Sequence, residues 1–331
     1  KRESIATYKE GSVPGSGGGS GDVFSPDYVA VTTNGKPYLV DKHGNVRVPP
    51  AWGPLSPTAF AKSVCVDYDP VNRILFVGGY AGTLYVTSLA DIENMQMKSI
   101  KVFGTSNISC VRLCNGKILV GRDASNQVYV QPHFSDIHDY ADGQAGVGIL
   151  SSGYTAKDFL FHNGYYYSSS QAGEIHRTSN PSGNWAELTD RAADFRKMVA
   201  TDNKLIVFGK DDNRRNDRNF FALKNTPTTW NEFDIESSSD VYVSDAVAYD
   251  LDRALVVTNK EYGGVKILNS NNSTVLFTPP LAKNCGGICV SGGSAVVAIQ
   301  EGSGATKIAI SDGGSWSYLN VPQFFTKLFG W

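Results

Sequence analysis

The sequence predicts an all-β protein, specifically a β-propeller built from four-stranded antiparallel sheets. Three observations lead to this prediction. A strand–turn–strand unit recurs about every 45 residues, tight-turn dipeptides separate its strands, and amphipathic helical segments are nearly absent. Seven blades fit the number of units best, and six blades are the alternative.

The first half of each unit is a pair of apolar strands joined by a short turn. Six copies are found, at residues 63–79, 108–122, 157–170, 197–209, 245–258 and 286–299. Several turns carry residue pairs that tolerate positive φ, which two-residue hairpins require. These pairs are Asn115-Gly116, Asn163-Gly164, Asp202-Asn203 and Gly292-Gly293.

The second half of each unit adds two more strands. The third strands are expected at 82–88, 126–131, 173–179, 219–224, 263–269 and 306–311. A more polar fourth strand follows, often marked by tryptophan, as at Trp185, Trp230 and Trp316. Helical character is confined to 91–97 and 190–197, each long enough for one or two turns, so a TIM barrel or a Rossmann fold is excluded.

The two ends of the repeat array predict how the ring closes. An incomplete unit covers residues 27–52, and the apolar segment 321–331 follows the last complete unit. Exposed, this segment would form a large apolar patch. We expect it to close the ring by pairing with or packing under residues Tyr28 to Val31, since open sheet edges are otherwise left. Docking to a neighbouring subunit is the alternative.

Composition divides the chain into three parts. Residues 1–14 form a polar leading peptide, residues 15–21 (GSGGGSG) form a Gly/Ser linker, and residues 22–331 form the propeller. The leading peptide is interpreted as an anchor or a grafted tag. The linker is compatible with a natural tether and with an engineered junction.

Charge and cysteine content limit the possible partners and cofactors. Thirty Lys and Arg against 32 Asp and Glu give a net charge of −2, which offers no basic field for nucleic acid or an anionic membrane. Apolar runs are strand-sized, so no membrane insertion is expected. The five cysteines, Cys65, Cys110, Cys114, Cys285 and Cys289, lie in or beside apolar strands and are expected to be reduced structural thiols. No cofactor and no metal site are predicted.

Two turns resemble the Asp-box of β-propellers, the architecture of sialidases and of many phage tail and virion proteins. The turn SNPSGNW (179–185) is close to the pattern S-x-D-x-G-x-T-W, with Asn180 in place of Asp, and SDGGSW (311–316) is a shortened version. The resemblance implies a structural role, in which a polar residue caps the hairpin and tryptophan packs between blades. The residues concerned are Ser179, Asn180, Gly183, Trp185, Ser311, Asp312 and Trp316.

Catalytic residues are not expected. The resemblance to sialidases implies three arginines that bind the substrate carboxylate. Arg47 in NVRVPP matches the early motif loosely, but Arg253 is the last arginine, so a late one is missing. The histidines show no metal spacing, and His133 and His138 are placed in a surface loop. The charge-rich segment 210–218 and the tyrosines 165–167 are interpreted as a solvated hairpin and as packing residues, respectively.

These observations favour a non-enzymatic structural or binding propeller. The expected function is that of a bacteriophage virion component, attached to the tail or capsid, that mediates assembly or host-surface recognition. Its partners would be other virion proteins, reached through residues 1–14, and a host-surface glycan or protein. A secreted or cell-surface glycan- or protein-binding propeller and a degenerate sialidase-like enzyme are the alternatives. A cytosolic scaffold that binds peptides is a further one.

Overall fold

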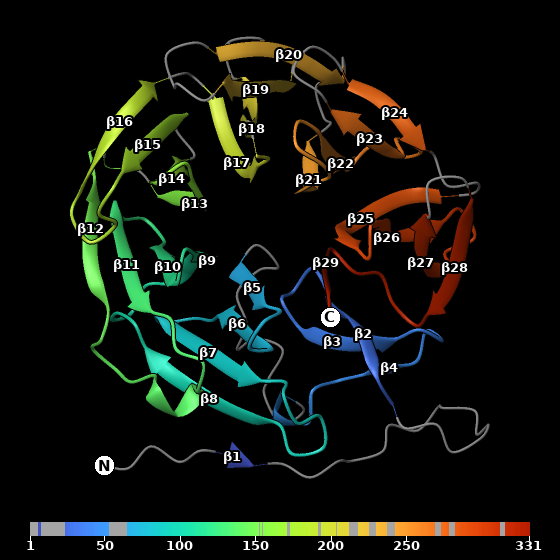
Figure 1. The fold of residues 1–331 in the computed structure, drawn as a ribbon, viewed down its shortest axis with the longest axis horizontal. Helices are drawn as coiled ribbons and strands as arrows, with labels where there is room; N and C mark the ends of the chain where they lie inside the picture. The colour runs from blue at the N-terminus through green and yellow to red at the C-terminus, as the bar shows by residue number, and fades with distance from the viewer. Residues whose placement is uncertain are drawn as a thin grey trace.

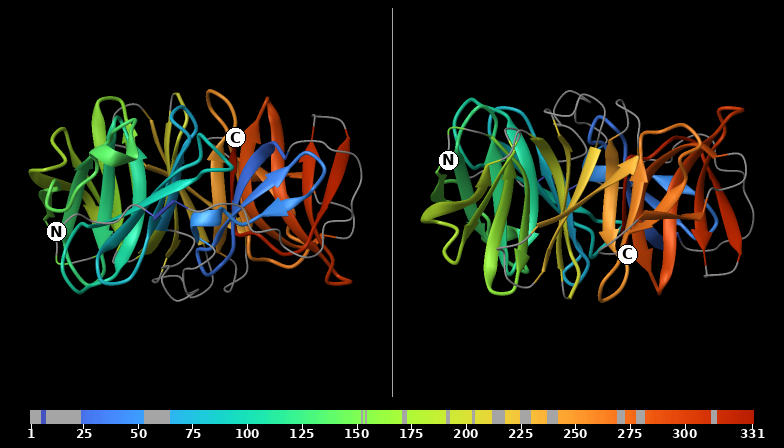
Figure 2. Two further views of the ribbon diagram at one scale, coloured as in Figure 1. Left: turned by 90° about the horizontal axis from the view of Figure 1, so that it is seen from below. Right: turned by 90° about the horizontal axis from the view of Figure 1, so that it is seen from above.

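The protein is a seven-bladed β-propeller, described here from a computed structural model. The structure describes residues 6–7, 24–52, 65–151, 153, 155–170, 173–190, 193–202, 204–211, 218–224, 230–236, 242–268, 273–277, 282–311 and 315–331. The blades surround a central axis (Figure 1), and the side views show a disc with two flat faces (Figure 2). No helix of the described residues is both long and apolar enough to cross a bilayer.

Blade 1 contains strands from both ends of the array. From the axis outward it consists of β29 (Lys327–Gly330), β2 (Pro26–Val31), β3 (Pro37–Asp41) and β4 (Val46–Arg47). Blade 2 consists of β5 (Val66–Asp69), β6 (Ile74–Gly78), β7 (Thr83–Ser88) and β8 (Gln96–Lys101). A two-residue strand, β1 (Ala6–Thr7), pairs with the outer edge of β8.

Blades 3 and 4 are joined at their outer strands. Blade 3 consists of β9 (Ile108–Cys114), β10 (Lys117–Arg122), β11 (Gln127–Pro132) and β12 (Gly146–Leu150). Blade 4 consists of β13 (Ala156–His162), β14 (Tyr165–Ser170), β15 (Glu174–Thr178) and β16 (Asn184–Asp190). The parallel pairing of β12 with β16 makes one eight-stranded sheet from the two blades.

Blades 5, 6 and 7 each form a separate four-stranded sheet. Blade 5 consists of β17 (Ala193–Ala200), β18 (Lys204–Asp211), β19 (Arg218–Lys224) and β20 (Trp230–Glu236). Blade 6 consists of β21 (Val243–Ala248), β22 (Ala254–Thr258), β23 (Val265–Leu268) and β24 (Ser273–Phe277). Blade 7 consists of β25 (Ala282–Ser291), β26 (Ser294–Glu301), β27 (Thr306–Ser311) and β28 (Trp316–Val321).

The tight hairpins expected from the sequence are present. Asn115 and Gly116 have φ of 47° and 70°, and Asn163 and Gly164 have φ of 48° and 81°. Positive φ at both central residues matches the right-handed twist of the flanking strands. The turn residue Asn203 lies outside the described residues. The two segments expected to contain helical turns differ from that expectation: residues 91–94 form a turn before β8, and the described part of 190–197 belongs to β16 and β17. Two short 3-10 turns, η1 (Pro50–Trp52) and η4 (Ile137–Asp139), occur elsewhere.

Ring closure by the C-terminal segment is confirmed. Strand β29 pairs antiparallel with β2, with Tyr28 opposite Gly330 and Val31 opposite Lys327. The backbone amide of Thr326 also donates to the carbonyl oxygen of Val31 at 2.8 Å. The innermost strand of blade 1 therefore comes from the end of the array and the other three strands from its start, as Figure 1 shows.

Two glycines in β25 admit the closing segment. A Cβ atom on Gly286 would lie 2.1 Å from the carbonyl oxygen of Phe325, and one on Gly287 would lie 2.4 Å from the backbone of Lys327. Neither contact is sterically possible, because both opposing atoms are backbone. The amide of Gly287 donates to the Phe325 oxygen at 3.1 Å. These glycines are therefore required where the last blade meets the closing strand.

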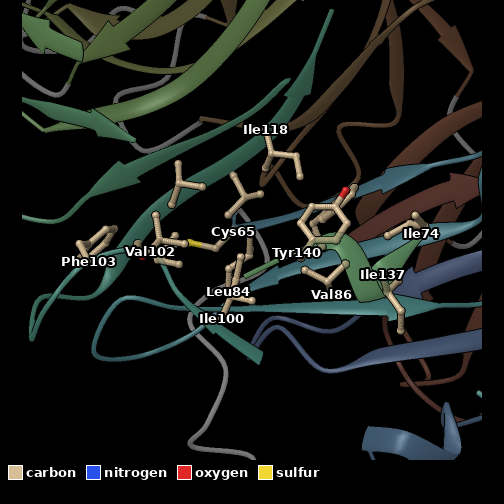
Figure 3. Close-up of a cluster of buried hydrophobic side chains, with 14 residues drawn as sticks. Cys65, Ile74, Leu84, Val86, Ile100, Val102, Phe103, Ile118, Ile137 and Tyr140 are labelled. Atoms are coloured by element: carbon tan, nitrogen blue, oxygen red, sulfur yellow. Dashed lines mark hydrogen bonds between the residues drawn. The ribbon is translucent and has the colours of Figure 1, made fainter. Parts of the chain in front are cut away.

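The hydrophobic core is distributed between the blades. Seven clusters of described residues lie one at each contact between adjacent blades. Figure 3 shows the cluster between blades 2 and 3, in which Ile74, Leu84 and Val86 of blade 2 approach Ile118 and Tyr140 of blade 3. Each sheet is thus covered on both faces, which explains why second strands such as β6 (ILFVG) and β22 (ALVVT) are buried runs of mostly apolar residues.

Loss of the closing contact should destabilise the isolated protein. Phe325 is fully buried between blades 1 and 7, with its ring centroid 5.7 Å from that of Tyr38. Truncation of a buried phenylalanine costs about 3–5 kcal/mol. We expect Phe325→Ala to lower the free energy of unfolding by about this amount in denaturant titration, and deletion of residues 321–331 to lower the melting temperature still further.

Val71→Ala is the matched control, because Val71 is 86% exposed. It should change the stability by less than about 0.5 kcal/mol. Equal stability of Phe325→Ala and the wild type would contradict closure by this segment.

Candidate functional site

Charged side chains line the axis of the ring. The innermost strands of six blades each place one charged residue at the corresponding level, and the seventh, β25, has Gly287 there. In blade order from blade 1, the residues are Lys327, Asp67, Arg112, Asp158, Lys197 and Asp245. We call these six the axial charge ring. Its three acids and three bases sum to zero.

The three aspartates connect blade 2 to blade 3, blade 4 to blade 5 and blade 6 to blade 7. Asp67 accepts the backbone amide of Leu113 at 2.7 Å, and Asp158 accepts that of Met198 at 2.8 Å. Asp245 accepts that of Ile288 at 3.3 Å. The amides belong to inner strands whose axial edge has no strand partner, so the carboxylates satisfy donors that would otherwise be buried without an acceptor.

Two of the three bases in the axial charge ring form ion pairs. The Nε atom of Arg112 lies 2.9 Å from a carboxylate oxygen of Asp158, and Lys197 Nζ lies 3.1 Å from Asp245. Burial disfavours the charged form of Arg112, but Asp158 and Asp67 outweigh it and raise the pKa of the guanidinium above its usual range. Arg112 is therefore held charged, and the ion pairs hold both side chains in place.

Lys327 differs from the other two bases. It is buried, 7% exposed, and makes no ion pair or hydrogen bond through its ammonium with any residue that the structure describes. The pKa of Lys327 is lowered to about 8: burial is the largest cause, Lys197 and Arg112 act in the same direction, and Asp245 and Asp67 oppose them. The axial charge ring thus contains one cation without an anion in contact.

A second polar cluster joins the loops of blades 2 and 3. Asp69 Oδ2 lies 2.8 Å from His133 Nε2, and the other ring nitrogen of His133 lies 2.7 Å from the hydroxyl of Tyr140. Tyr140 is completely buried and also accepts the amide of Phe134. His133 therefore forms a contact between blades and differs from the surface-loop residue that was expected. His138, on the same loop, is exposed, and its Nε2 atom lies 2.9 Å from Gln96 Oε1.

A third polar cluster, on β14 and β15, is not marked by any motif in the sequence. Ser168 and His176 are directly opposite each other on β14 and β15, and the Ser170 hydroxyl donates to Glu174. Serine, histidine and glutamate together suggest nucleophilic catalysis, but Ser168, Ser170 and His176 have no exposed surface. A substrate cannot reach them. Burial lowers the pKa of His176 to about 4, so the ring is neutral.

The five cysteines are free and buried, as expected for structural thiols. Cys65 donates to the carbonyl oxygen of Ile108 at 3.3 Å, a contact between blades 2 and 3. Burial raises the pKa of Cys285 and of Cys289 to about 12, which keeps them protonated and poor metal ligands. Among the described residues, no three His, Cys, Asp or Glu side chains are grouped to hold a metal ion.

The turn 179–185 closes on itself and contacts blade 3. Asn180 Oδ1 accepts the amide of Ser182 at 3.3 Å, and the Trp185 indole donates to the Pro181 oxygen at 3.0 Å. Gly183 donates to the Asn180 oxygen and accepts the amide of Ile149, which connects the turn to β12. Ser179 is exposed beside it. A polar side chain capping the turn and a buried tryptophan are the geometry that the Asp-box resemblance implies.

The other residues singled out in the sequence are dispersed. Ser311 and Trp316 are directly opposite each other on β27 and β28, and Asp312 lies outside the described residues. Arg47 is on the outermost strand of blade 1, 4.4 Å from the ring centroid of Phe24, far from the axis. Residues 212–217 of the charged segment lie outside the described residues. Tyr166 and Tyr167 are buried on opposite faces of β14, and Tyr165 is partly exposed.

One exposed aromatic residue has an unusual backbone. Tyr262, in the connection between β22 and β23, is 58% exposed and has φ of +58°. The left-handed region is disfavoured for a bulky side chain by about 1–2 kcal/mol. The corresponding connections of blades 2 and 3 place Ala81 and Ala124 at φ of 51° and 53°. A tyrosine is therefore not needed to form this type of turn.

Tyr242 lies close to this connection. The amide of Asn259 donates to its carbonyl oxygen at 3.0 Å, and Arg196 lies 5.3 Å from the centroid of its ring. The amide of Tyr262 donates to the carbonyl oxygen of Lys283 at 2.7 Å, and Lys283 forms an ion pair with Glu261. We call Tyr242, Tyr262, Arg196, Glu261 and Lys283 the tyrosine patch. Nothing in the strand pattern marks it: Tyr242, Glu261 and Tyr262 lie on or beside connections, Lys283 lies near the start of β25, and Arg196 lies at an irregularity within β17.

Comparison with known proteins identifies the fold. No protein-family model matches the sequence, and no curated protein matches it either. Solved structures do match. "YCF48 bound to D1 peptide" has a TM-score of 0.56 and 13% sequence identity, and the match covers 80% of this chain and 82% of that chain. "Crystal Structure of Mitotic Checkpoint Complex" has a TM-score of 0.55 and 10% identity, and the match covers 96% of this chain and 91% of that chain. The WD40 β-propeller domain of Doa1 is also similar, with a TM-score of 0.53 and 16% identity over 75% of this chain and 79% of that chain. At these identities the likeness shows a β-propeller and adds no support for the Asp-box or sialidase resemblance.

Acid should destabilise the protein through His176. Because its pKa is about 4 when folded and 6.5 in the reference state, the unfolded chain binds the proton first as the pH falls. The contribution of neutral His176 to the free energy of unfolding is present above pH 6.5 and is lost between pH 6.5 and 4. The loss amounts to about 3 kcal/mol. Urea titrations across this range should show a smaller loss of stability in His176→Gln than in the wild type. His138→Gln, in an exposed loop, is the control and should retain the wild-type slope; an unchanged slope in His176→Gln would contradict the assignment.

Proposed function

We propose that this protein is a non-enzymatic propeller that binds a protein partner through the tyrosine patch. The observation that carries the proposal is the conformation of Tyr262, whose large side chain is exposed from a left-handed backbone position. Strain of this kind is retained where a side chain has a role beyond forming the turn. The alanines at the corresponding connections of blades 2 and 3 give the comparison.

The composition of the tyrosine patch supports recognition of a protein. Tyrosine and arginine are enriched among the residues that contribute most to protein–protein binding. Tyr242 is half-exposed beside the Arg196 guanidinium, and the Lys283–Glu261 pair adds charge of both signs at the rim. One of the similar structures is a propeller solved with a bound peptide, which agrees with this use of the fold.

The other polar clusters support a role without catalysis. Asp69 and His133 contact each other, Asp158 and Arg112 form an ion pair, and His176 is inaccessible and neutral. The buried thiols are held protonated. The sialidase-like alternative would need an arginine cluster around a substrate carboxylate, whereas Arg47 lies on an outer strand against Phe24.

We further propose that the propeller is a bacteriophage virion component, made in the host cytoplasm and attached to a tail or capsid. Buried free thiols suit synthesis in a reducing compartment. Residues 1–14 and the linker 15–21 would attach the ring to other virion proteins. The pairing of β1 with β8 makes the outer edge of blade 2 a place where an extended segment is held.

Tyr262→Ala tests the proposed binding surface. Peptides are first selected from a random display library on the immobilised wild-type protein, and their affinities are then measured by fluorescence anisotropy. We expect Tyr262→Ala to weaken the selected peptides at least tenfold, which is about 1.4 kcal/mol. Its melting temperature should be equal to or above that of the wild type, because alanine relieves strain. Tyr80→Ala, an exposed tyrosine on the distant blade 2, is the matched control. Equal affinities for the wild type and Tyr262→Ala would overturn the proposal.

The virion assignment is tested on particles. Tail or capsid genes beside the coding sequence identify the phage, whose particles are purified and analysed by mass spectrometry. We expect the chain to be present at a fixed ratio to the tail or capsid proteins. Deletion of residues 1–14 should remove it from particles without preventing the ring from folding. Particles that lack the chain would refute the assignment and leave the binding surface to be judged separately.

A further inference from the structure

We propose that the ammonium group of Lys327 is a binding site for an oxyanion, a carboxylate or phosphate group that enters along the axis of the ring. No partner for this ammonium is found among the described residues, and it lies within a set of charges that are otherwise paired. The inference is independent of the tyrosine patch.

The position of Lys327 is fixed by the ring closure. It is the first residue of β29 and is opposite Val31, and its neighbour Thr326 donates to the Val31 oxygen. On its other side, the backbone of Lys327 is so close to Gly287 that a Cβ atom there would lie 2.4 Å away. The Lys327 backbone therefore cannot shift toward a remote carboxylate without opening the ring.

The neighbours of Lys327 do not supply an anion. On the blade 7 side, the corresponding position is Gly287, which has no side chain. On the blade 2 side it has Asp67, which accepts the Leu113 amide and faces Arg112, with 3.9 Å between charged atoms. The aromatic contact of Lys327, to the ring of Phe329 at 5.7 Å, does not neutralise the charge.

A buried cation without a counter-ion has an unfavourable desolvation free energy. An anion in contact with Lys327 would offset it. Lys197 and Arg112 repel the ammonium, while Asp245 and Asp67 attract it from beyond ion-pair distance. An oxyanion in contact with Nζ would accept hydrogen bonds from its three donors. Arg112 and Lys197 would attract the oxyanion from a longer distance, and Asp67 and Asp245 would repel it, so the direct contact with Nζ supplies the binding energy.

The axis is open enough for water to reach these groups. The side chains of Arg112, Lys197 and Asp67 keep 18%, 12% and 12% of their surface exposed. Lys327 itself is 7% exposed. These exposed fractions give solvent a way to the charged groups near the axis, whereas Ser168 and His176 have no exposed surface.

The experiment uses the full chain and three probes at equal ionic strength: inorganic phosphate, acetate and chloride. The ¹³Cε resonance of Lys327, assigned by comparison with Lys327→Met, is followed against pH. We expect phosphate or acetate to raise the pKa of Lys327 from about 8 toward its ordinary value near 10, with chloride having a smaller effect. The melting temperature at pH 7 should rise with the concentration of the same anion.

Lys327→Met should abolish the anion-dependent rise in melting temperature, and Lys307→Met should retain it, because Lys307 is already paired with Glu301. A response to acetate alone identifies a carboxylate site, and a response to phosphate a phosphate site. If the Lys327 resonance titrates identically in all three salts, the proposal is wrong. The resonance of the wild type decides the matter even if Lys327→Met fails to fold.

Discussion

The free axial edges of the innermost strands are the constraint on which the rest of this ring depends. Each innermost strand pairs with its own blade on one side only. The backbone amides on its other side face the axis, where no neighbouring strand accepts their hydrogen bonds. Aspartates on alternate blades solve this by accepting an amide of the next blade, and bases on the blades between them balance the charge. The same contacts that satisfy the backbone therefore set the order and spacing of the blades.

This arrangement separates stability from recognition. Polar groups near the axis and between blades are engaged in holding neighbouring sheets together, as in the contacts of Asp69 with His133 and of Asp158 with Arg112. The connections on the faces join neighbouring blades mainly through their backbone, as where the Tyr262 amide donates to the Lys283 oxygen, so their side chains can vary. Tyr262 occupies such a connection, and its departure from the alanines of blades 2 and 3 is the kind of change that a fixed ring tolerates.

The fold could be predicted from the sequence because its determinants are local and repeated. Asn115-Gly116 and Asn163-Gly164 specify hairpins by backbone conformation alone, and the apolar tail pairs with β2, the first strand of the incomplete unit. The axial charge ring could not be predicted. Asp67, Asp158 and Asp245 appear in the sequence as single polar residues in apolar strands, and their relation exists only once the ring has closed. The burial of Ser168 and His176 depends in the same way on the adjacent blade.

Closure by β29 also has a consequence for biosynthesis. The closing strand is made about 300 residues after β2, its partner. At about 5–20 residues per second, the edge of β2 stays unpaired on the ribosome for about 15–60 s, a period in which an exposed strand edge can recruit another nascent chain. Because Gly286 and Gly287 are translated about 40 residues before the closing strand, the groove that receives it can form first. Closure of the ring is then the pairing of β29 with β2 against a seventh blade whose strands have already been made.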